Sequence, residues 1–214
     1  MGVAAKICGL STGQAVEAAV TGGAAYLGFV FFPRSPRAVT PQQAAWLCGN
    51  VPAGIIRVGL FVDADDATIE GALTAAPLDM FQFHGSEPPE RVAEVRRRFG
   101  RPVMKAIAIA RLEDLASAAR YENAADRLLF DAKPPRRPEA LPGGNGLAFD
   151  WSLIAGRIWR RPWMLSGGLT AELLPEAVRI SGATAVDVSS SVESRPGIKD
   201  AAKIRAFLAA ARAL

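Results

Sequence analysis

The sequence predicts a closed (β/α)8 barrel, an α/β fold in which eight parallel strands alternate with helices. Eight short apolar runs recur along the chain, and their ends lie 22 to 36 residues apart. Helix-starting residues and helical apolar spacing lie between these runs. Strand-helix units repeated in this way require parallel strands with right-handed crossovers. Eight of them favour a barrel over the competing open doubly wound sheet, whose G-x-G-x-x-G motif after the first strand is absent.

The predicted strands are short and rich in aliphatic, β-branched and aromatic residues. Each gap between two strands has room for one helix and two loops, so we expect a helix in every gap. The predicted strands are residues 3–8, 26–32, 55–62, 78–84, 103–109, 127–132, 163–168 and 185–190.

Local signals place several of the helices. Thr40 and Pro41 are typical of an N-cap and of the first helical position. Pro88 and Pro89 begin another helix, which stops at Gly100. The predicted helices cover residues 11–22, 41–49 and 88–100, and a C-terminal stretch in which Ile204, Phe207, Leu208 and Ala211 form a buried stripe.

The connection after the sixth predicted strand is unusually long. Residues 133–151 form it, and proline and glycine are concentrated there. A flexible surface loop is the alternative interpretation, but loops on this face build the sites of such barrels. We therefore expect a lid over the mouth of the barrel.

Composition and charge narrow the possible functions. The 214 residues are predicted to form one domain, residues 1–214, with 25 basic and 21 acidic residues and a net charge of +4. The densest basic run, residues 96–98, lies on the outer face of a predicted helix, so nucleic acid is not an expected partner. No secretory signal or membrane-spanning run is visible, and two cysteines make neither a disulfide framework nor a metal cluster. We expect a cytoplasmic protein without a metal.

Polar and reactive residues collect where the predicted strands end, on the rim where barrel enzymes place their chemistry. The triplets SGG and SSS, residues 166–168 and 189–191, are typical of a phosphate site built from backbone N–H groups and hydroxyls. Ordinary turns are the alternative for both. The residues on this rim are Cys8, Arg37, His84, Asp131, Gly167, Gly168, Ser189 and Ser190.

Cys8 and Lys6 share one face of the first strand, because side chains alternate along a strand. If Cys8 points into the barrel mouth, Lys6 lies one layer below it and near Asp187 of the eighth strand. A Lys6–Asp187 ion pair is expected, since a buried lysine without a partner is costly. The lysine would lower the pKa of the thiol. A small buried hydrophobic role is equally compatible with the position of Cys8, and we assign that role to Cys48.

Asp131 follows an apolar run, so desolvation should raise the pKa of its carboxyl group and allow it to act as a general acid. A helix cap or a partner for Lys133 is the alternative. A thiolate base and a carboxylic acid across one cavity suit an isomerase. His84, the single histidine, is expected to line the pocket rather than catalyse, and Arg37 offers a bidentate fork for a carboxylate.

Several motifs together resemble the phosphoribosylanthranilate isomerase family, and they run in order through nearly the whole chain. They are KICG (6–9), GFVFFPRSPR (28–37), QFHG (82–85), LLFDAKPP (128–135), FDW (149–151), LSGGL (165–169), VDVSSSVE (186–193) and GIKD (197–200). The resemblance implies a barrel without cofactor that acts in tryptophan biosynthesis. The implied reaction is an Amadori rearrangement of N-(5′-phosphoribosyl)anthranilate to 1-(2-carboxyphenylamino)-1-deoxyribulose 5-phosphate. By the family pattern, Cys8 is the general base, Asp131 the general acid and Arg37 the residue that holds the anthranilate carboxylate.

Two positions depart from the family pattern. Ser191 stands where the family usually has glycine, and Asn145 stands where it usually has threonine. Ser191 is expected to strain a loop that requires positive φ. A histidine-pathway or dual-substrate aminoaldose isomerase and a non-catalytic sugar-phosphate-binding barrel stay open as alternatives. The expected partner is a small phosphorylated molecule, without nucleic acid or membrane, and the chain is expected to be a monomer or a homodimer.

Overall fold

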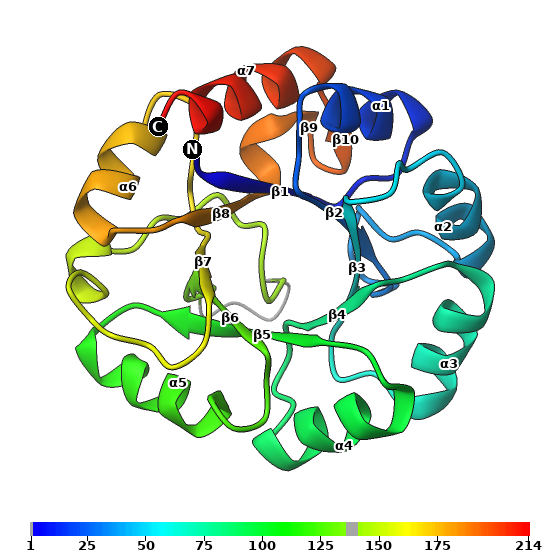
Figure 1. Ribbon diagram of the computed structural model, residues 1–214, viewed down its shortest axis with the longest axis horizontal. Helices are drawn as coiled ribbons and strands as arrows, with labels where there is room; N and C mark the ends of the chain where they lie inside the picture. Colours follow the sequence, from blue (N-terminus) through cyan, green and yellow to red (C-terminus); the bar gives the residue numbers. More distant parts are fainter. Residues whose placement is uncertain (1, 136–140) are drawn as a thin grey trace.

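The computed structural model describes residues 2–135 and 141–214 of the chain. Eight parallel strands follow one another in chain order around a closed barrel, and β8 pairs with β1 to complete the ring (Figure 1). The predicted (β/α)8 architecture is confirmed. The strands of the barrel are β1 (Ala4–Cys8), β2 (Tyr26–Val30), β3 (Ile56–Phe61), β4 (Met80–Phe83), β5 (Val103–Ile109), β6 (Arg127–Ala132), β7 (Trp163–Leu165) and β8 (Ala185–Val188).

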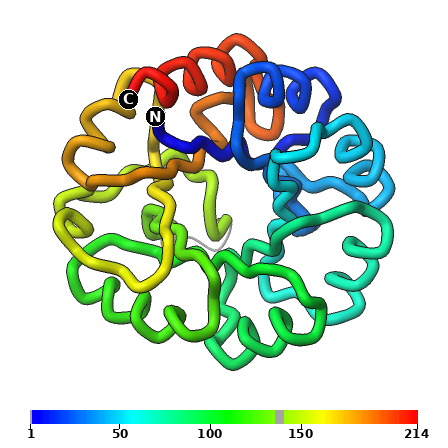
Figure 2. The backbone as a smooth tube through the Cα atoms, in the orientation of Figure 1, coloured from blue at the N-terminus to red at the C-terminus, as the bar shows by residue number. Residues whose placement is uncertain are grey.

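Helices surround the barrel as an outer ring (Figure 1). The chain makes one circuit, so its last helix packs beside its first and its two ends come together (Figure 2). The helices are α1 (Gly13–Thr21), α2 (Pro41–Cys48), α3 (Asp66–Ala75), α4 (Pro89–Phe99), α5 (Ala116–Tyr121), α6 (Leu174–Ser181) and α7 (Ala201–Arg212). Shorter elements are the 3₁₀-helices η1 (Leu112–Leu115), η2 (Trp151–Leu153) and η3 (Ser190–Val192), and the hairpin strands β9 (Glu193–Arg195) and β10 (Ile198–Lys199).

The helix ends follow the predicted local chemistry. Thr40 caps α2 reciprocally: its hydroxyl accepts from the N–H of Gln43 at 3.1 Å, and its own N–H donates to the Gln43 side chain at 2.8 Å. Pro89 begins α4, and the helix is followed by Gly100 with φ +60°, a left-handed conformation that costs glycine little.

Six predicted strands are too long by one to three residues, and one predicted helix is missing. β1, β3 and β4 begin one or two residues later than predicted, and β3 and β4 also end one residue earlier. β2, β7 and β8 end at Val30, Leu165 and Val188 rather than at positions 32, 168 and 190. After β7, Gly167 and Gly168 take φ values of +86° and +64°, which turn the backbone out of the strand conformation. Between β6 and β7 the described residues form one 3₁₀-helix, η2, and no α-helix, because part of the connection lines the barrel mouth instead.

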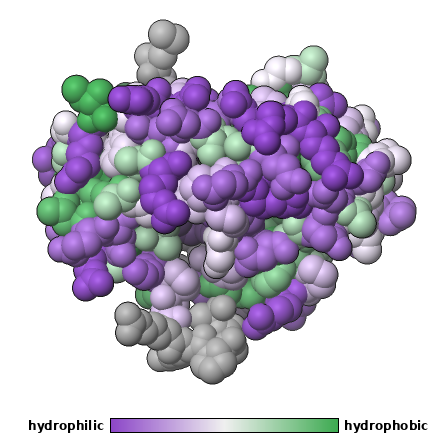
Figure 3. Space-filling view, turned by 90° about the horizontal axis from the view of Figure 1, so that it is seen from below, coloured by the Kyte–Doolittle hydropathy of each residue, from purple (hydrophilic) through white to green (hydrophobic). Residues whose placement is uncertain are grey.

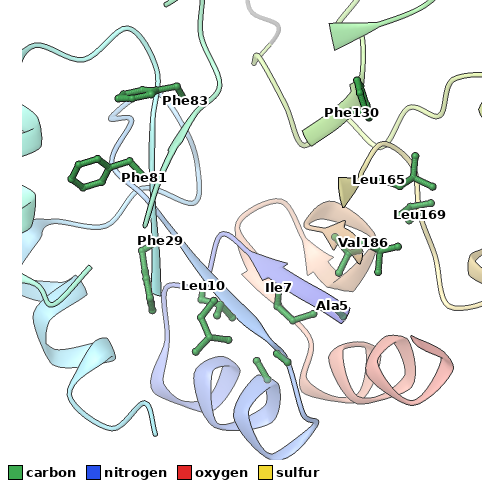
Figure 4. Packing of buried hydrophobic residues seen from close by; sticks show 14 of the residues in the cluster. Ala5, Ile7, Leu10, Phe29, Phe81, Phe83, Phe130, Leu165, Leu169 and Val186 are labelled. Carbon is green, nitrogen blue, oxygen red and sulfur yellow. The ribbon is translucent and has the colours of Figure 1, made fainter. Parts of the chain in front are cut away.

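The strands separate two apolar layers. On β1, Ala5 and Ile7 point toward the helices that cover this strand (Figure 4). Lys6 and Cys8 alternate with them and therefore point into the barrel. Apolar side chains from most of the strands close the interior below the rim: Tyr26, Val58, Met80, Met104, Ala106, Leu129, Met164 and Ala185.

The outer surface is mostly hydrophilic on the face that Figure 3 shows, and its hydrophobic side chains lie in separate small patches. Across residues 2–135 and 141–214, no helix combines the length and the apolar character needed to cross a bilayer.

Candidate active site

The strand ends and the loop after β6 surround one cavity at the carboxyl end of the barrel. The structure brings together all the residues that the sequence placed on the rim. Those that line the cavity are Cys8, Arg37, His84, Asp131, Gly167, Gly168, Ser189 and Ser190, together with Asp187. Segments that are up to 182 positions apart in sequence, from residue 8 to residue 190, therefore face one space.

Lys6 and Asp187 form the predicted ion pair below the thiol. Strands β1 and β8 pair with Lys6 opposite Asp187, and Nζ lies 2.8 Å from Oδ1 with both side chains buried. Ser166 donates to the other carboxylate oxygen, Oδ2, at 3.1 Å. Both charges are thus compensated, as burial requires.

Burial decides the pKa of the Cys8 thiol. Desolvation raises the pKa and the Lys6 ammonium lowers it, and the balance lies above the ordinary value. The lysine lowers the thiol pKa as predicted, but burial has the larger and opposite effect. At Lys6 itself burial disfavours the ammonium, yet Asp187 and Cys8 together outweigh burial and raise its pKa.

Two glycines make room for side chains at the end of β1. Gly9 has φ +77°, and a Cβ there would lie 2.6 Å from Cδ of Arg37. The arginine side chain therefore passes directly over the end of β1. Gly28 lies opposite Cys8 in β2, and a Cβ there would lie 2.9 Å from Sγ. The motif KICG ends in glycine for two reasons, the positive φ and the closeness of Arg37.

Asp131 is held in the cavity by His84. Its Oδ2 lies 3.1 Å from His84 Nε2, and its Oδ1 accepts from the next backbone N–H at 2.9 Å. The amide nitrogen of Gln82 lies 3.0 Å from Nδ1, so the imidazole ring has contacts on both sides. Lys133, the alternative partner, pairs with Asp114 at 2.8 Å instead. His84 thus has a specific contact with the carboxyl group that the sequence singled out.

The ends of β2 and β3 give the cavity an apolar wall. Val30, Phe32, Leu60 and Val62 line it, and Val30 and Leu60 pack with Cys8. A flat apolar group can lie against this wall while polar groups at both ends of the cavity hold its charged substituents.

Arg37 is buried, and one edge of its guanidinium is already engaged. Nε donates to Glu193 Oε1 at 2.7 Å, and Nη2 donates to Oε2 at 2.9 Å. Nη2 also donates to the carbonyl of Gly144 at 3.3 Å. Arg37 also lines the cavity, and the Nη1 edge of the group, on which Gly144 packs, carries the donors that remain for a ligand carboxylate.

The loops after β7 and β8 form a polar end of the cavity. The positive φ values of Gly167 and Gly168 let the backbone of this loop approach a ligand closely. Ser189 donates its hydroxyl to the carbonyl of Cys8 at 3.1 Å, and Ser190 begins η3 on the cavity wall. The predicted glycine and serine triplets thus lie side by side.

Both departures from the family pattern add hydrogen bonds to cavity-lining loops. Ser191 does not have a positive φ, so the expected strain is wrong; Asp63 is the one non-glycine residue with positive φ in the described chain. The Ser191 hydroxyl donates to the carbonyl of Leu169 and joins the loops after β7 and β8. Asn145 donates its side-chain N–H to the carbonyl of Leu141 at 2.8 Å.

Part of the predicted lid lies over the cavity. Residues 141–147 line it. A Cβ at Gly143 would lie 2.6 Å from His84 Nε2, and a Cβ at Gly144 would lie 2.6 Å from Arg37 Nη1. The loop therefore packs directly on two side chains of the rim. Residues 136–140 of the predicted lid lie outside the described residues.

Two charged residues of the site were not predicted: Glu193 contacts Arg37, and Lys199 contacts Ser189. Both belong to the β9–β10 hairpin, which was not predicted. The available signal is the Pro-Gly turn at residues 196–197 between two short polar stretches. Among the described side chains, no three His, Cys, Asp or Glu residues are arranged to hold a metal ion.

Comparison with known sequences identifies relatives along the whole chain. A family model described as N-(5′-phosphoribosyl)anthranilate (PRA) isomerase matches residues 5–210. A protein from Rhodospirillum centenum named N-(5′-phosphoribosyl)anthranilate isomerase is 60% identical over 214 residues, which is 100% of both chains. A protein of the same name from Cereibacter sphaeroides is 59% identical over 211 residues and 99% of both chains.

Solved structures show the same similarity. The phosphoribosyl anthranilate isomerase of Thermotoga maritima superposes with a TM-score of 0.89 at 35% identity, over 99% of this chain and 100% of that one. A second structure is the isomerase in complex with reduced 1-(o-carboxyphenylamino)-1-deoxyribulose 5-phosphate. It superposes with a TM-score of 0.86 at 33% identity, again over 99% of this chain and 100% of that one.

Proposed function

The chain belongs to the N-(5′-phosphoribosyl)anthranilate isomerase family, and from this membership we propose how its site works. The protein is an isomerase of tryptophan biosynthesis that converts an aminoaldose into an aminoketose. We propose that Cys8 is its general base and Asp131 its general acid. The observation that supports these roles is that both residues line one cavity, between a buried arginine and loops rich in glycine and serine.

Asp131 starts the reaction by giving its proton to the furanose ring oxygen. The bond between that oxygen and C1 breaks, and the lone pair of the anilino nitrogen forms the C1=N bond of an iminium ion. His84, 3.1 Å from Oδ2, keeps the carboxyl group in place for this transfer.

Cys8 then takes the proton from C2. The electrons of the C2–H bond form a C1=C2 bond and neutralise the iminium nitrogen, which gives an enolamine. Loss of the enol proton and protonation of C1 give the aminoketone. Because the iminium accepts the electrons, a base of modest strength suffices. The positive charges of the iminium and of Lys6 both favour the thiolate and oppose the effect of burial.

The two ends of the substrate are held by different parts of the rim. We place the phosphate at the loops that contain Gly167, Gly168, Ser189 and Ser190, the aromatic ring on the apolar wall, and the carboxylate at Arg37. Contacts to these non-reacting ends orient C2 toward the thiolate and lower the entropic cost of the reaction.

A coupled assay with freshly made N-(5′-phosphoribosyl)anthranilate tests the function, run beside the aminoaldose substrate of the histidine pathway. We expect rapid turnover of the anthranilate substrate and little or none of the other. Turnover of the histidine-pathway substrate alone would overturn the assignment.

Gly9→Ala is expected to raise the KM of the substrate several-fold and to lower stability. The methyl group would meet Cδ of Arg37 and displace the guanidinium, and the residue would keep an unfavourable φ of +77°. The conformational part should cost about 1–2 kcal/mol of unfolding free energy. Steady-state kinetics and urea denaturation measure the two effects.

Gly100→Ala is the matched control for this variant. Gly100 also has a positive φ, but a Cβ there meets nothing within 4 Å, and the residue follows α4 far from the rim. We expect a similar loss of stability with an unchanged KM. An unchanged KM in Gly9→Ala as well would show that the position of the Arg37 guanidinium does not depend on this glycine.

Ser191→Gly, which restores the usual family residue, is expected to weaken binding of the phosphorylated substrate. It removes the hydrogen bond to Leu169 that joins the two loops and adds backbone freedom. One such bond contributes about 1 kcal/mol, so KM should rise about five-fold. Ser194→Gly is the control, since Ser194 is exposed and makes a 3.4 Å bond within its own hairpin. Equal KM values for both variants and the parent protein would refute the prediction.

We also propose a cytoplasmic protein with one domain over residues 1–214, acting as a monomer or a homodimer. The isomerase of Thermotoga maritima is described as dimeric. Sedimentation equilibrium of the purified chain distinguishes the two states.

A further inference from the structure

Glu193 joins the two buried cations that lie next to the cavity. It is the first residue of β9 and is 6% exposed. Its Oε1 accepts from Arg37 Nε and from Lys199 Nζ, each at 2.7 Å, and its Oε2 accepts from Arg37 Nη2 at 2.9 Å. The backbone N–H of Gly197 donates to Oε2 at 3.2 Å. Four donors therefore fix this one carboxylate.

We propose that Glu193 is the positioning residue that aims Arg37 at the carboxylate of the substrate. This inference rests on the proposed function, in which Arg37 binds that carboxylate. The guanidinium is planar, so fixing Nε and Nη2 also fixes the direction of the remaining Nη1 side. The other contact of Nη2, to the carbonyl of Gly144, is long at 3.3 Å, and a substrate carboxylate can replace it.

Lys199 connects the same carboxylate, through Ser189, to the end of β1 at Cys8. Its Nζ donates to the carbonyl of Ser189 at 2.8 Å and to the Ser189 hydroxyl at 3.2 Å. That hydroxyl donates to the carbonyl of Cys8 at 3.1 Å. Glu193 thus sets where Arg37 lies relative to the end of β1, which fixes the distance between the carboxylate site and the thiol.

The charges of this cluster suit one anionic group. Burial disfavours the Glu193 carboxylate, but Arg37 and Lys199 outweigh burial and hold its pKa below the ordinary value. Two cations and one carboxylate leave a net charge of 2 − 1 = +1 beside the cavity. A single substrate carboxylate would neutralise it.

The test compares two ligands in Glu193→Gln. One ligand is reduced 1-(o-carboxyphenylamino)-1-deoxyribulose 5-phosphate, and the other is the same molecule without the benzoate carboxylate. We expect the dissociation constant of the first ligand to rise about ten-fold or more, because the variant misaligns the charge-assisted contact between Arg37 and the benzoate carboxylate. The dissociation constant of the second ligand should change little, because that ligand does not make this contact. A merely structural role would weaken both ligands equally, and that result would overturn the inference.

Asp79→Asn is the matched control. The Arg57–Asp79 pair has the same fork, with Nε to Oδ2 at 2.7 Å and Nη2 to Oδ1 at 2.9 Å. It lies at the other end of the barrel, because Arg57 is near the start of β3 and Asp79 precedes β4. We expect unchanged affinity for both ligands in this variant.

Two more variants keep the test decisive. Glu193→Asp retains the buried charge and so covers the case in which Glu193→Gln does not fold; its shorter side chain should still reduce the preference for the carboxylate ligand. Arg37→Met tests carboxylate binding by Arg37 separately from the positioning of Arg37 by Glu193. If Arg37→Met keeps the preference for the carboxylate ligand, the proposed role of Arg37 itself fails. If Arg37→Met loses the preference and both Glu193 variants keep it, the positioning role is overturned.

Discussion

Replacing Cys8 with alanine is expected to abolish most turnover while leaving affinity for the reduced product nearly unchanged. The alanine side chain cannot take the proton from C2, but it preserves the cavity and the ion pair below it. Loss of a general base should lower kcat roughly 10²- to 10⁴-fold. Asp131→Asn should have an effect of similar size, because the amide has no proton to give to the ring oxygen. Single-turnover kinetics and calorimetric titration with the reduced product measure the two quantities.

Each variant has a control of the same residue type. Cys48→Ala removes the other cysteine, which is buried on α2, and should leave kcat unchanged. Asp126→Asn changes an aspartate directly before β6, at the end of the strand away from the cavity, and should also leave kcat unchanged. If Cys8→Ala and Asp131→Asn both retained full turnover, the acid–base mechanism would be wrong.

Replacing Lys6 with methionine is expected to give the largest loss of stability of any single change considered. It leaves the buried Asp187 carboxylate without its cation, and breaking a buried pair in this way costs about 3–5 kcal/mol of unfolding free energy. Arg57→Met removes the cation of a half-exposed pair and should cost about 1 kcal/mol or less. Lys6→Met combined with Asp187→Asn should recover part of the loss, because no buried charge is left unpaired. Urea denaturation of the parent protein, Lys6→Met, Arg57→Met and the double variant measures these losses of unfolding free energy.

The same variant tests the electrostatic link to the thiol. Lys6 lowers the pKa of Cys8 against the effect of burial, so its removal should move that pKa further upward. The rate of Cys8 alkylation should then rise only at higher pH than in the parent protein. The measurement is made in the Cys48→Ala background, so that Cys8 is the cysteine that reacts. Cys48 itself should react slowly, because burial raises its pKa to about 11. If the pH dependence of Cys8 alkylation were the same in Lys6→Met and in the parent protein, Lys6 would have no influence on the pKa of the thiol.

The alternation of strands and helices was sufficient to predict the barrel, because the spacing of apolar runs reflects the fold directly. Strand ends were less predictable. The residues after β7 and β8 are glycine and serine, which occur both in strands and in turns, and backbone φ values decide between the two. The missing helix between β6 and β7 could not be predicted either, because residues 141–147 pack on the cavity rather than on the strands.

Within the site, alternation along β1 and the pairing of β1 with β8 predicted the Lys6–Asp187 contact. The direction of the thiol pKa could not be predicted, because it depends on how fully the barrel excludes water from Cys8. Glu193 and Lys199 were missed for another reason. They lie on a hairpin after the last barrel strand, where the strand-helix pattern gives no expectation about which side chains turn toward the rim.

A crystal structure of Asp131→Asn with the reduced product bound would show whether Cys8 and position 131 act on one ligand in one cavity. We expect Sγ of Cys8 to lie within reach of C2 and the side chain at position 131 to lie beside the oxygen of the former ring. A ligand whose sugar lies away from either side chain, or whose phosphate lies away from the loops after β7 and β8, would contradict this expectation.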